Sequence, residues 1–264
     1  MNKMRSHQLN HILNNKTLGS SELVRFLNSY LFSIRNNKRE IIKTISLSKR
    51  KLGHFEAVNS YLNELDNYLC GSSKSELIDF LKRFSSKENE KIEAIFNKVY
   101  PILKKMQSVI TLSRSGTVLA VLKLWHQKNK NLIVIVCESR PKLEGRLMAE
   151  ELAANGIKVE LITDAMMGLF ALKINAAIIG ADVILKNGNV VNKVGSKTLA
   201  LLCREYKKPF YVVTSKSKLS NKKIFKPKKN NPQEIWDKKV KNLSISNIYF
   251  EEIDKKLITK IFTD

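Results

Sequence analysis

The sequence predicts an α/β protein in which a helical N-terminal domain is followed by a mostly parallel β-sheet with helices on both faces. Two observations support this fold class. Apolar side chains recur at the spacing of one helix face along the first hundred residues, and from about residue 107 short β-branched runs alternate with helix-length amphipathic stretches. The chain has 264 residues, 43% of them hydrophobic, which is enough for a substantial core. We therefore expect a helical domain over residues 1–107 and an α/β domain over residues 108–264.

The clearest helical pattern lies near the N-terminus. Its apolar residues follow the spacing i, i+3, i+4, i+7, i+8 and i+11, and they are Leu23, Phe26, Leu27, Tyr30, Leu31 and Ile34. Two shorter stripes follow at Leu77–Phe84 and Ile92–Val99, and we expect Pro101 to interrupt the second one. These patterns predict a helical bundle or cap.

Strand candidates in the second half of the chain are short and apolar. They cover Val109–Thr111, Leu132–Val136, Val159–Ile162, Ala176–Ile179 and Phe210–Val213. Helical stretches lie between them, and one runs from about Glu144 to Asn155 and ends at Gly156. This alternation predicts parallel βαβ units. The Asn187-Gly188 dipeptide predicts a small hairpin over Val183–Val191.

The net charge of +23 comes from 47 Lys and Arg residues against 24 Asp and Glu residues. The basic excess is concentrated in residues 1–54 and in residues 207–229, and the second range holds nine lysines and no acid. Two interpretations stay open. The lysines either attract a polyanion such as nucleic acid or form an ordinary solvated surface, and no aromatic residues that could stack on bases are interleaved with them.

Composition also argues against several classes of protein. The three cysteines, Cys70, Cys137 and Cys203, are far apart and odd in number, which argues against a disulfide framework and for a reducing compartment. Only His7 and His11 share a helical spacing and no Cys-x-x-Cys pair occurs, so we expect no metal site. There is no signal-peptide pattern and no apolar stretch of the roughly 20 residues that span a bilayer. We expect a cytoplasmic protein with no cofactor and no membrane contact.

Ligands in open α/β sheets collect at the carboxyl ends of the strands, where helix N-termini present N–H groups. The first candidate site is the turn after the first predicted strand, which contains Ser113, Arg114, Ser115 and Gly116. Its N–H groups, hydroxyls and guanidinium are suited to an anion. The alternative is that Ser115 or Thr117 only caps the next helix, although capping leaves the arginine unexplained.

Two further segments have a similar composition. The segment over residues 192–198 contains Asn192 and Lys193 and precedes an apolar helix, but its glycine and lysine spacing does not fit a Walker A loop. No G-x-G-x-x-G sequence occurs, so dinucleotide binding has no support. Near the N-terminus Gly19 and Ser20 precede a helix, where capping is the simpler explanation and contact with an anion the alternative.

Asp182 follows an apolar strand in the sequence Gly180-Ala181-Asp182. A carboxylate at the end of a strand is a common general base. The local sequence fits a solvated turn aspartate equally well, so both interpretations stay open.

A series of motifs in the second half of the chain resembles one known family. In order, the motifs are Cys137–Pro141, Glu144–Arg146, Glu151-Leu152, Gly156-Ile157, Thr163–Ala165, Gly180–Asp182, Asn187-Gly188, Asn192–Ser196, Pro209–Val212 and Phe250–Ile253. The series resembles the initiation factor 2B superfamily, which joins the alpha, beta and delta subunits of that translation factor with the methylthioribose-1-phosphate and ribose-1,5-bisphosphate isomerases. The resemblance is close from about residue 107 onward. It implies a helical N-terminal domain, a Rossmann-like C-terminal domain and a homodimer or higher homo-oligomer.

The resemblance also implies roles for individual residues. In the isomerases a cysteine after the first strand and the aspartate of the Gly-Ala-Asp motif carry out the aldose–ketose conversion, while an arginine and an Asn-Lys pair hold the sugar phosphate. Asp182, Arg140, Asn192 and Lys193 fill matching positions, but Ser113 stands in place of the cysteine. A hydroxyl is a much weaker acid than a thiol and needs a partner base, and no histidine lies near Ser113 in the sequence.

A second departure concerns the phosphate-binding element near the N-terminus of the family, where Leu18 replaces an arginine before Gly19. The missing cysteine, together with an anion-binding constellation that is otherwise kept, favours a non-catalytic regulatory protein, similar to the translation factor subunits, that binds a sugar phosphate or nucleotide phosphate at helix N-termini. The alternative is an aldose–ketose isomerase that acts through Asp182 with another proton donor.

Two expectations complete the sequence-based hypothesis. If one phosphorylated ligand is bound, Arg114, Arg140 and Lys193 should line a common cradle, and separate directions for these side chains would argue against it. The basic segment over Lys216–Lys229 adds a third hypothesis, which is contact with RNA or a translation factor.

Overall fold

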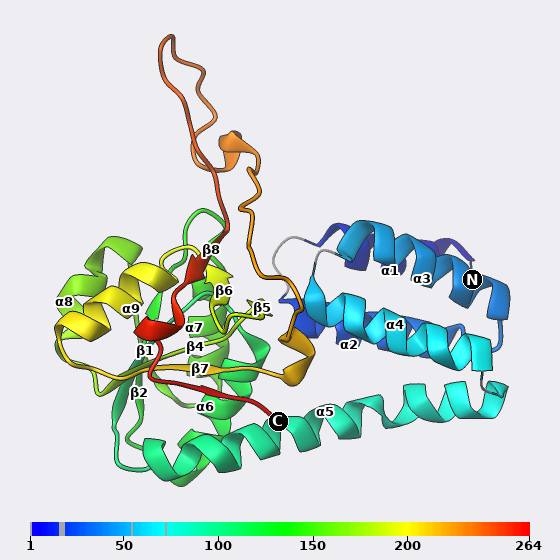
Figure 1. Cartoon of the computed structure of the whole chain (residues 1–264), viewed down its shortest axis with the longest axis horizontal. Helices are drawn as coiled ribbons and strands as arrows, with labels where there is room; N and C mark the ends of the chain where they lie inside the picture. Colours follow the sequence, from blue (N-terminus) through cyan, green and yellow to red (C-terminus); the bar gives the residue numbers. More distant parts are fainter. Residues whose placement is uncertain (1, 16–18, 54, 72) are drawn as a thin grey trace. The chain divides into compact units, whose positions relative to one another are not determined.

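The computed structural model describes residues 2–15, 19–53, 55–71 and 73–264 (Figure 1). Internal contacts divide the chain into two units, residues 1–93 and residues 94–264. The division falls within helix α5 (Lys74–Leu103), whose last part contributes apolar side chains to the core of the second unit. Over the described ranges, no helix combines the length and the apolar character needed to cross a membrane.

The first unit is built from amphipathic helices, each of which buries one face. They are α1 (Asn2–Asn14), α2 (Ser20–Ser33), α3 (Lys38–Leu52), α4 (Glu56–Gly71) and the first part of α5. The stripe predicted in α2 lies at the centre of their core, where Leu23, Leu27 and Leu31 are fully buried. Phe26 is exposed, because the buried face of α2 is centred on Leu27 and takes in Val24 instead.

Helix α5 corrects one prediction. The stripes over Leu77–Phe84 and Ile92–Val99 belong to a single helix of 30 residues, and Pro101 lies inside its last turn. The residues between the two stripes are mostly polar but include no glycine or proline, so the helical backbone continues through them.

The second unit contains a six-stranded parallel sheet in the order β3-β2-β1-β4-β7-β9. The strands are β1 (Ser108–Leu112), β2 (Ile133–Cys137), β3 (Lys158–Ile162), β4 (Ala176–Ile179), β7 (Phe210–Val213) and β9 (Lys260–Phe262). The five predicted strands and the α/β class are confirmed. Strand β9 was not predicted, because three residues are too few to show a pattern.

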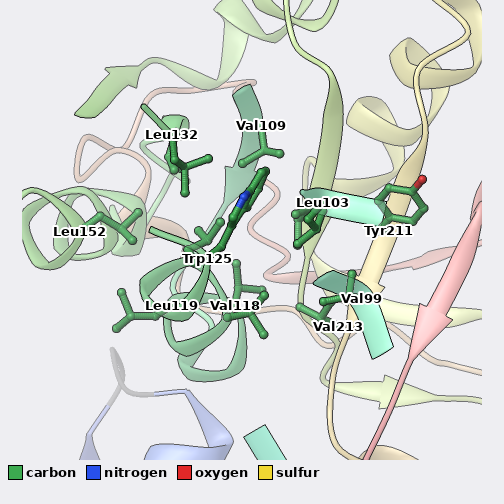
Figure 2. Packing of buried hydrophobic residues seen from close by; sticks show 14 of the residues in the cluster. Val99, Leu103, Val109, Val118, Leu119, Trp125, Leu132, Leu152, Tyr211 and Val213 are labelled. Atoms are coloured by element: carbon green, nitrogen blue, oxygen red, sulfur yellow. The ribbon is translucent and has the colours of Figure 1, made fainter. Parts of the chain in front are cut away.

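The central strands of this sheet, β1, β2, β4 and β7, are buried on both faces, because their alternate residues point into two separate cores. Val109 belongs to a core with Trp125 of α6 (Gly116–Lys128) and Leu152 of α7 (Glu144–Ala154), as Figure 2 shows. The next residue, Ile110, belongs to a second core with Leu199 of α9 (Ser196–Glu205) and side chains of α8 (Met167–Ala171). The predicted cover of helices on both faces is therefore confirmed.

A smaller antiparallel sheet has the order β5-β6-β8, with β5 (Val183–Ile184), β6 (Val190–Lys193) and β8 (Phe250–Ile253). The hairpin predicted at Asn187-Gly188 is confirmed, since β5 pairs with β6 and Gly188 has a φ of +88°. Between β7 and β8 the chain forms an irregular extension, drawn in orange in Figure 1. We call residues 220–249 the arm.

Candidate functional site

The candidate site lies where the strand order of the parallel sheet reverses. β1 has β2 on one side and β4 on the other. From β1, the strands β2 and β3 extend the sheet in one direction, and β4, β7 and β9 extend it in the other. In open α/β sheets, the carboxyl ends of the strands at such a point form the usual ligand crevice. Ser113 directly follows β1 and Asp182 comes shortly after β4, so two of the predicted loops are neighbours.

Gly180 shows how closely these two loops approach each other. A Cβ atom on Gly180 would lie 2.5 Å from the Oγ and 2.8 Å from the Cβ of Ser115. Only glycine leaves room for the turn after β1, which explains its place in the Gly180-Ala181-Asp182 sequence. Asp182 itself lies with Oδ1 4.0 Å from the Nζ of Lys218.

The turn between β1 and α6 combines a left-handed residue with a helix cap. Ser113 has a φ of 61°, and its N–H donates to Ser139 Oγ over 2.6 Å. Ser115 is the N-cap of α6, and its Oγ accepts a hydrogen bond from the N–H of Val118 at 3.4 Å. The capping interpretation is thus confirmed for Ser115. Gly116 begins α6, where N–H groups have no acceptor within the helix.

Arg114 forms an ion pair with Glu151 of α7. Its Nε and Nη2 atoms both lie 2.6 Å from Glu151 Oε1, and the arginine side chain is largely buried. The pair ties the turn after β1 to α7. It also accounts for the arginine that helix capping left unexplained.

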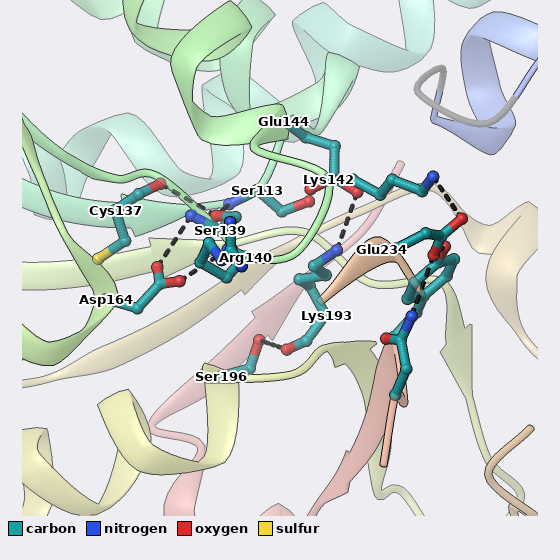
Figure 3. A network of polar contacts seen from close by, with 12 residues as sticks. Ser113, Cys137, Ser139, Arg140, Lys142, Glu144, Asp164, Lys193, Ser196 and Glu234 are labelled. Carbon is teal, nitrogen blue, oxygen red and sulfur yellow. Dashed lines mark hydrogen bonds and ion pairs between the residues drawn. The ribbon is translucent and has the colours of Figure 1, made fainter. Parts of the chain in front are cut away.

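The turn after β2 is closed by a carboxylate of the protein itself. Asp164 accepts hydrogen bonds from the N–H groups of Ser139 (2.9 Å) and Arg140 (2.7 Å), and Ser139 Oγ donates to the carbonyl of Cys137 (Figure 3). The guanidinium of Arg140 reaches the arm instead, where its Nη2 lies 3.4 Å from the carbonyl oxygen of Ile235. Asp164 therefore takes the backbone donors that this turn could offer to an anion.

Glu251 of β8 accepts hydrogen bonds from backbone N–H groups at the start of α9, as Asp164 does after β2. Its Oε1 accepts hydrogen bonds from the N–H groups of Gly195 (2.7 Å) and Lys197 (2.9 Å). Asn192 is buried, and its Nδ2 donates to Ser196 Oγ over 2.9 Å. A negative charge is favourable at a helix N-terminus, so this segment is stabilised by an internal carboxylate.

Lys193 and Glu144 form a nearly buried ion pair. Lys193 Nζ lies 2.9 Å from Glu144 Oε1, and their side chains are 3% and 12% exposed (Figure 3). Glu144 begins α7, and a Cβ on the next residue, Gly145, would collide with the carbonyl of Cys137. The second oxygen, Glu144 Oε2, is buried and has no hydrogen-bond partner. An unsatisfied buried acceptor is costly, so a ligand donor at this atom would be strongly favoured.

Glu234 lies midway along the arm and attaches it to residues near this ion pair. It accepts hydrogen bonds from the Tyr249 hydroxyl and from Asn247 Nδ2 at 3.0 Å, and its Oε1 lies 2.5 Å from Lys142 Nζ. Burial alone would raise the pKa of Glu234, but these hydrogen bonds and the Lys142 charge hold it below its usual value. The ring of Tyr249 also lies 5.0 Å from Lys193 Nζ, so the arm and the site share contacts.

Cys137 is the cysteine that lies nearest in the sequence to these turns. It is fully buried, and burial together with the negative charge of Asp164 raises the pKa of its thiol to about 12. The thiol is therefore protonated at neutral pH and is a poor proton shuttle. It does not make up for the serine at position 113.

The cations of these turns were predicted from the sequence, but their acidic partners were not. Glu144 and Glu151 lie seven residues apart on α7, a spacing that places them on one helix face and is visible in the sequence. Glu251 lies 56 residues after Gly195, and no local pattern indicates that contact. Long-range pairing of this kind becomes visible only in the fold.

The other predicted residues are placed as follows. Gly19 and Ser20 belong to the first unit, where Gly19 is the N-cap of α2 and its N–H donates to Glu22 Oε2 at 3.4 Å. Leu18 lies outside the described residues. A common cradle for Arg114, Arg140 and Lys193 stays a prediction. The three side chains have different partners, namely Glu151, the carbonyl oxygen of Ile235 and Glu144. In the described part of the chain, no group of three His, Cys, Asp or Glu side chains is placed to hold a metal ion.

A family model matches nearly the whole chain. A model of the initiation factor 2 subunit family matches residues 7–264. The chain belongs to this family. Its relatives are named either as translation initiation factors or as sugar-phosphate isomerases. Family membership alone therefore does not decide between a regulatory role and an isomerase activity.

Relatives of both kinds are similar to this chain. A protein of Pyrococcus horikoshii named as translation initiation factor eIF-2B subunit 2-like is 41% identical over 139 residues, which cover 53% of this chain and 49% of that protein. A methylthioribose-1-phosphate isomerase of Dehalococcoides mccartyi is 37% identical, covering 56% and 48%. A ribose 1,5-bisphosphate isomerase of Methanocaldococcus jannaschii is 29% identical, covering 72% and 64%. The match spans about half the length of the first two relatives.

Solved structures agree with the family fold over nearly the whole chain. The translation initiation factor eIF-2B of Pyrococcus horikoshii has a TM-score of 0.79 at 25% identity and covers 98% of this chain and 94% of its own. The 5-methylthioribose 1-phosphate isomerase of the same organism has a TM-score of 0.83 at 21% identity, with coverage of 98% and 82%. The second likeness concerns the fold alone.

Proposed function

We propose that this member of the family is a non-catalytic regulatory protein, similar to the eIF-2B subunits, that binds a phosphorylated sugar or nucleotide at the carboxyl ends of β1, β2 and β4. The observation that carries the proposal is the unsatisfied, buried Oε2 of Glu144 beside Lys193. A carboxylate oxygen in this position needs a donor, and a sugar hydroxyl supplies one.

The phosphate of such a ligand suits a second place among the same turns. Gly116 begins α6 next to Ser113, and a helix N-terminus favours a phosphate through its N–H groups and its dipole. The charges of Arg114 and Lys193 are balanced by Glu151 and Glu144, so the ligand's phosphate depends mainly on N–H groups and hydroxyls. The ligand then joins a hydroxyl near Glu144 to a phosphate near α6.

The chemistry of the site supports binding without turnover. Aldose–ketose conversion needs a group that exchanges protons near neutrality, and the Ser113 hydroxyl is a poor acid. The thiol of Cys137 is fully buried with a pKa of about 12. The relatives named after translation initiation factors give independent support for a regulatory role.

The test is a thermal-shift titration with ribose 1,5-bisphosphate, 5-methylthioribose 1-phosphate and AMP, each against ribose and inorganic phosphate. A ligand present at 100 times its Kd stabilises the folded state by about 2.7 kcal/mol. We expect Glu144→Gln to weaken the shift because it alters the acceptor. Glu150→Gln, a change at an exposed residue of the same helix, should leave the shift intact. No stabilisation by any phosphorylated compound at millimolar concentration contradicts the proposal.

A second candidate function is an aldose–ketose isomerase. It is favoured by the position of Asp182 after β4 and by the relatives named as isomerases. Ketose formation from methylthioribose 1-phosphate or ribose 1,5-bisphosphate, above the level of an Asp182→Asn variant, would establish this function. Equal, background turnover by both proteins would remove it.

The proposal includes assembly into a homodimer or a higher homo-oligomer in the cytoplasm. Large apolar side chains are exposed at Leu169 of α8 (66%), at Leu172 directly after α8 (59%) and at Leu201 of α9 (39%), which is typical of a surface that a partner covers. One structural neighbour is described as a tetrameric eIF2B-beta2-delta2 complex.

A further inference from the structure

The arm carries a high density of positive charge. Lys222, Lys223, Lys226, Lys228 and Lys229 are exposed in its first half. Lys238, Lys239 and Lys241 are exposed in its second half. Glu234 and Asp237 are the only acids over residues 220–249.

The structure removes one of these two acids from the outer surface. Glu234 is turned inward, where it pairs with Lys142 and accepts hydrogen bonds from Asn247 and Tyr249. Asp237 is then the single carboxylate left among the eight exposed lysines of the arm. The outer surface of the arm therefore attracts polyanions more strongly than the composition of the segment indicates.

An aromatic ring lies within this charged surface. Trp236 is 45% exposed, and the Nζ of Lys238 lies 6.0 Å from the centre of its ring. The lysine run was considered only as far as residue 229 and without a stacking aromatic, although Phe225 lies between Lys223 and Lys226. Trp236, which follows that run and lies on the same arm, was missed. Lys218, which that run included, is buried near Asp182 and does not contribute to the surface.

We infer that the arm binds single-stranded nucleic acid, with lysines along the phosphates and a base stacked on Trp236. A polyanion with flat apolar faces fits both features, because lysines neutralise phosphates while an exposed indole stacks on bases of any sequence. A second copy of the chain fits less well in an arm-to-arm contact, since two equally basic segments would repel each other. This inference is independent of the ligand site proposed above.

Trp236 makes the binding directly measurable. The chain has two tryptophans, and the other, Trp125, is fully buried in the core. We expect a twelve-nucleotide oligouridylate to quench the exposed indole fluorescence, and Trp236→Ala to abolish the quenching and weaken binding in a fluorescence-anisotropy assay with labelled oligonucleotide. Oligodeoxyuridylate of the same length, which lacks only the 2′-hydroxyl, tests whether the ribose contributes.

A matched pair of triple variants separates a local site from general charge. Lys238→Gln, Lys239→Gln and Lys241→Gln together should weaken oligonucleotide binding at least tenfold and lower the slope of log K against log salt by about 2. The control changes Lys158, Lys173 and Lys207 to glutamine, since these residues are exposed in the same unit but outside the arm. Circular dichroism and the Tm should stay unchanged for both triple variants.

Three outcomes would overturn the inference. The first is equal loss of affinity in the two triple variants, which would indicate attraction by net charge alone. The second is unchanged affinity after the arm lysines are neutralised. The third is a result that points to a protein partner. Such a result is either binding of polyglutamate but not of oligonucleotide, or self-association that depends on Trp236.

Discussion

Lys193 Nζ lies 2.9 Å from Glu144 Oε1, while the other oxygen of the same carboxylate, Oε2, is buried and without a hydrogen-bond partner. One side of Glu144 thus serves the fold, and the other is free to receive a donor. This division of one side chain allows a stabilising ion pair to belong to the proposed ligand site as well.

Removing the lysine should be costly. Lys193→Met leaves a carboxylate nearly buried without its counter-charge, and we expect a loss of about 3–5 kcal/mol in the free energy of unfolding. The double variant with Glu144→Gln should recover most of it. Lys197→Met, at an exposed position of the same segment, should change stability by no more than about 0.5 kcal/mol. Urea denaturation measures all three, and an equal loss in the single and double variants would contradict the ion-pair explanation.

Gly180 should not accept a side chain. Gly180→Ala places a Cβ 2.5 Å from Ser115 Oγ, and we expect a loss of about 1–3 kcal/mol as the turn after β1 shifts. Gly168→Ala in α8 meets nothing within 4 Å and should be neutral or stabilising by up to about 1 kcal/mol. Combining Gly180→Ala with Ser115→Gly should cost less than the sum of the two single changes. Strict additivity in thermal unfolding would show that the two positions do not touch.

Glu234 should make stability depend on acid. Its pKa is lower in the folded protein than its unfolded value of about 4.3, so its contribution is complete above that value and is lost as the pH falls through the folded pKa. Between pH 6 and pH 3 the Tm should therefore fall less for Glu234→Gln than for the wild type. Glu205→Gln, at an exposed position, should follow the wild type. Parallel curves for Glu234→Gln and the wild type would be inconsistent with this anchor.

The thiols should differ in reactivity. Cys70 is exposed, whereas Cys137 and Cys203 are buried and burial raises the pKa of each thiol to about 12. An aromatic disulfide reagent at pH 7 should modify one thiol in the native protein and all three in denaturant. Cys70→Ser should leave none reactive in the native state. A second thiol that reacts rapidly in native protein would reopen proton transfer by Cys137.

The apolar surface on α8 should govern assembly. Leu169→Lys with Leu172→Lys replaces two exposed leucines by charges. We expect sedimentation velocity to show a shift toward monomer. The variant monomer should keep its Tm. Ile224→Lys, at an exposed apolar position on the arm, is the control and should leave the oligomeric state unchanged. A wild-type protein that sediments as a monomer at micromolar concentration would contradict the proposed assembly.

Much of the fold was accessible from local patterns. The β-branched runs predicted five strands, and Asn187-Gly188 predicted the hairpin, because the physics of strands and tight turns acts over a few residues. Short β9 and the continuity of α5 were missed, since three residues carry too little pattern and a polar stretch does not by itself end a helix.

The turns of the candidate site were predicted at strand ends, but their side-chain partners were not. The turn containing Ser113 and the Gly-Ala-Asp loop were predicted at strand ends, and the structure makes them neighbours through Gly180 and Ser115. The carboxylates were missed, because Asp164 and Glu251 reach N–H groups that lie far away in the sequence. Such contacts depend on which strands are adjacent, and no single segment encodes that.

The carboxylate at the start of α9 links two regions of the second unit. Glu251 holds the N–H groups of Gly195 and Lys197, and it belongs to β8, which begins directly after the arm. An anion arriving at α9 would compete with Glu251 for these donors. An anion and the Glu251 side chain therefore exclude each other from these two N–H groups, while the backbone pairing of β8 with β6 holds the root of the arm in place during such an exchange.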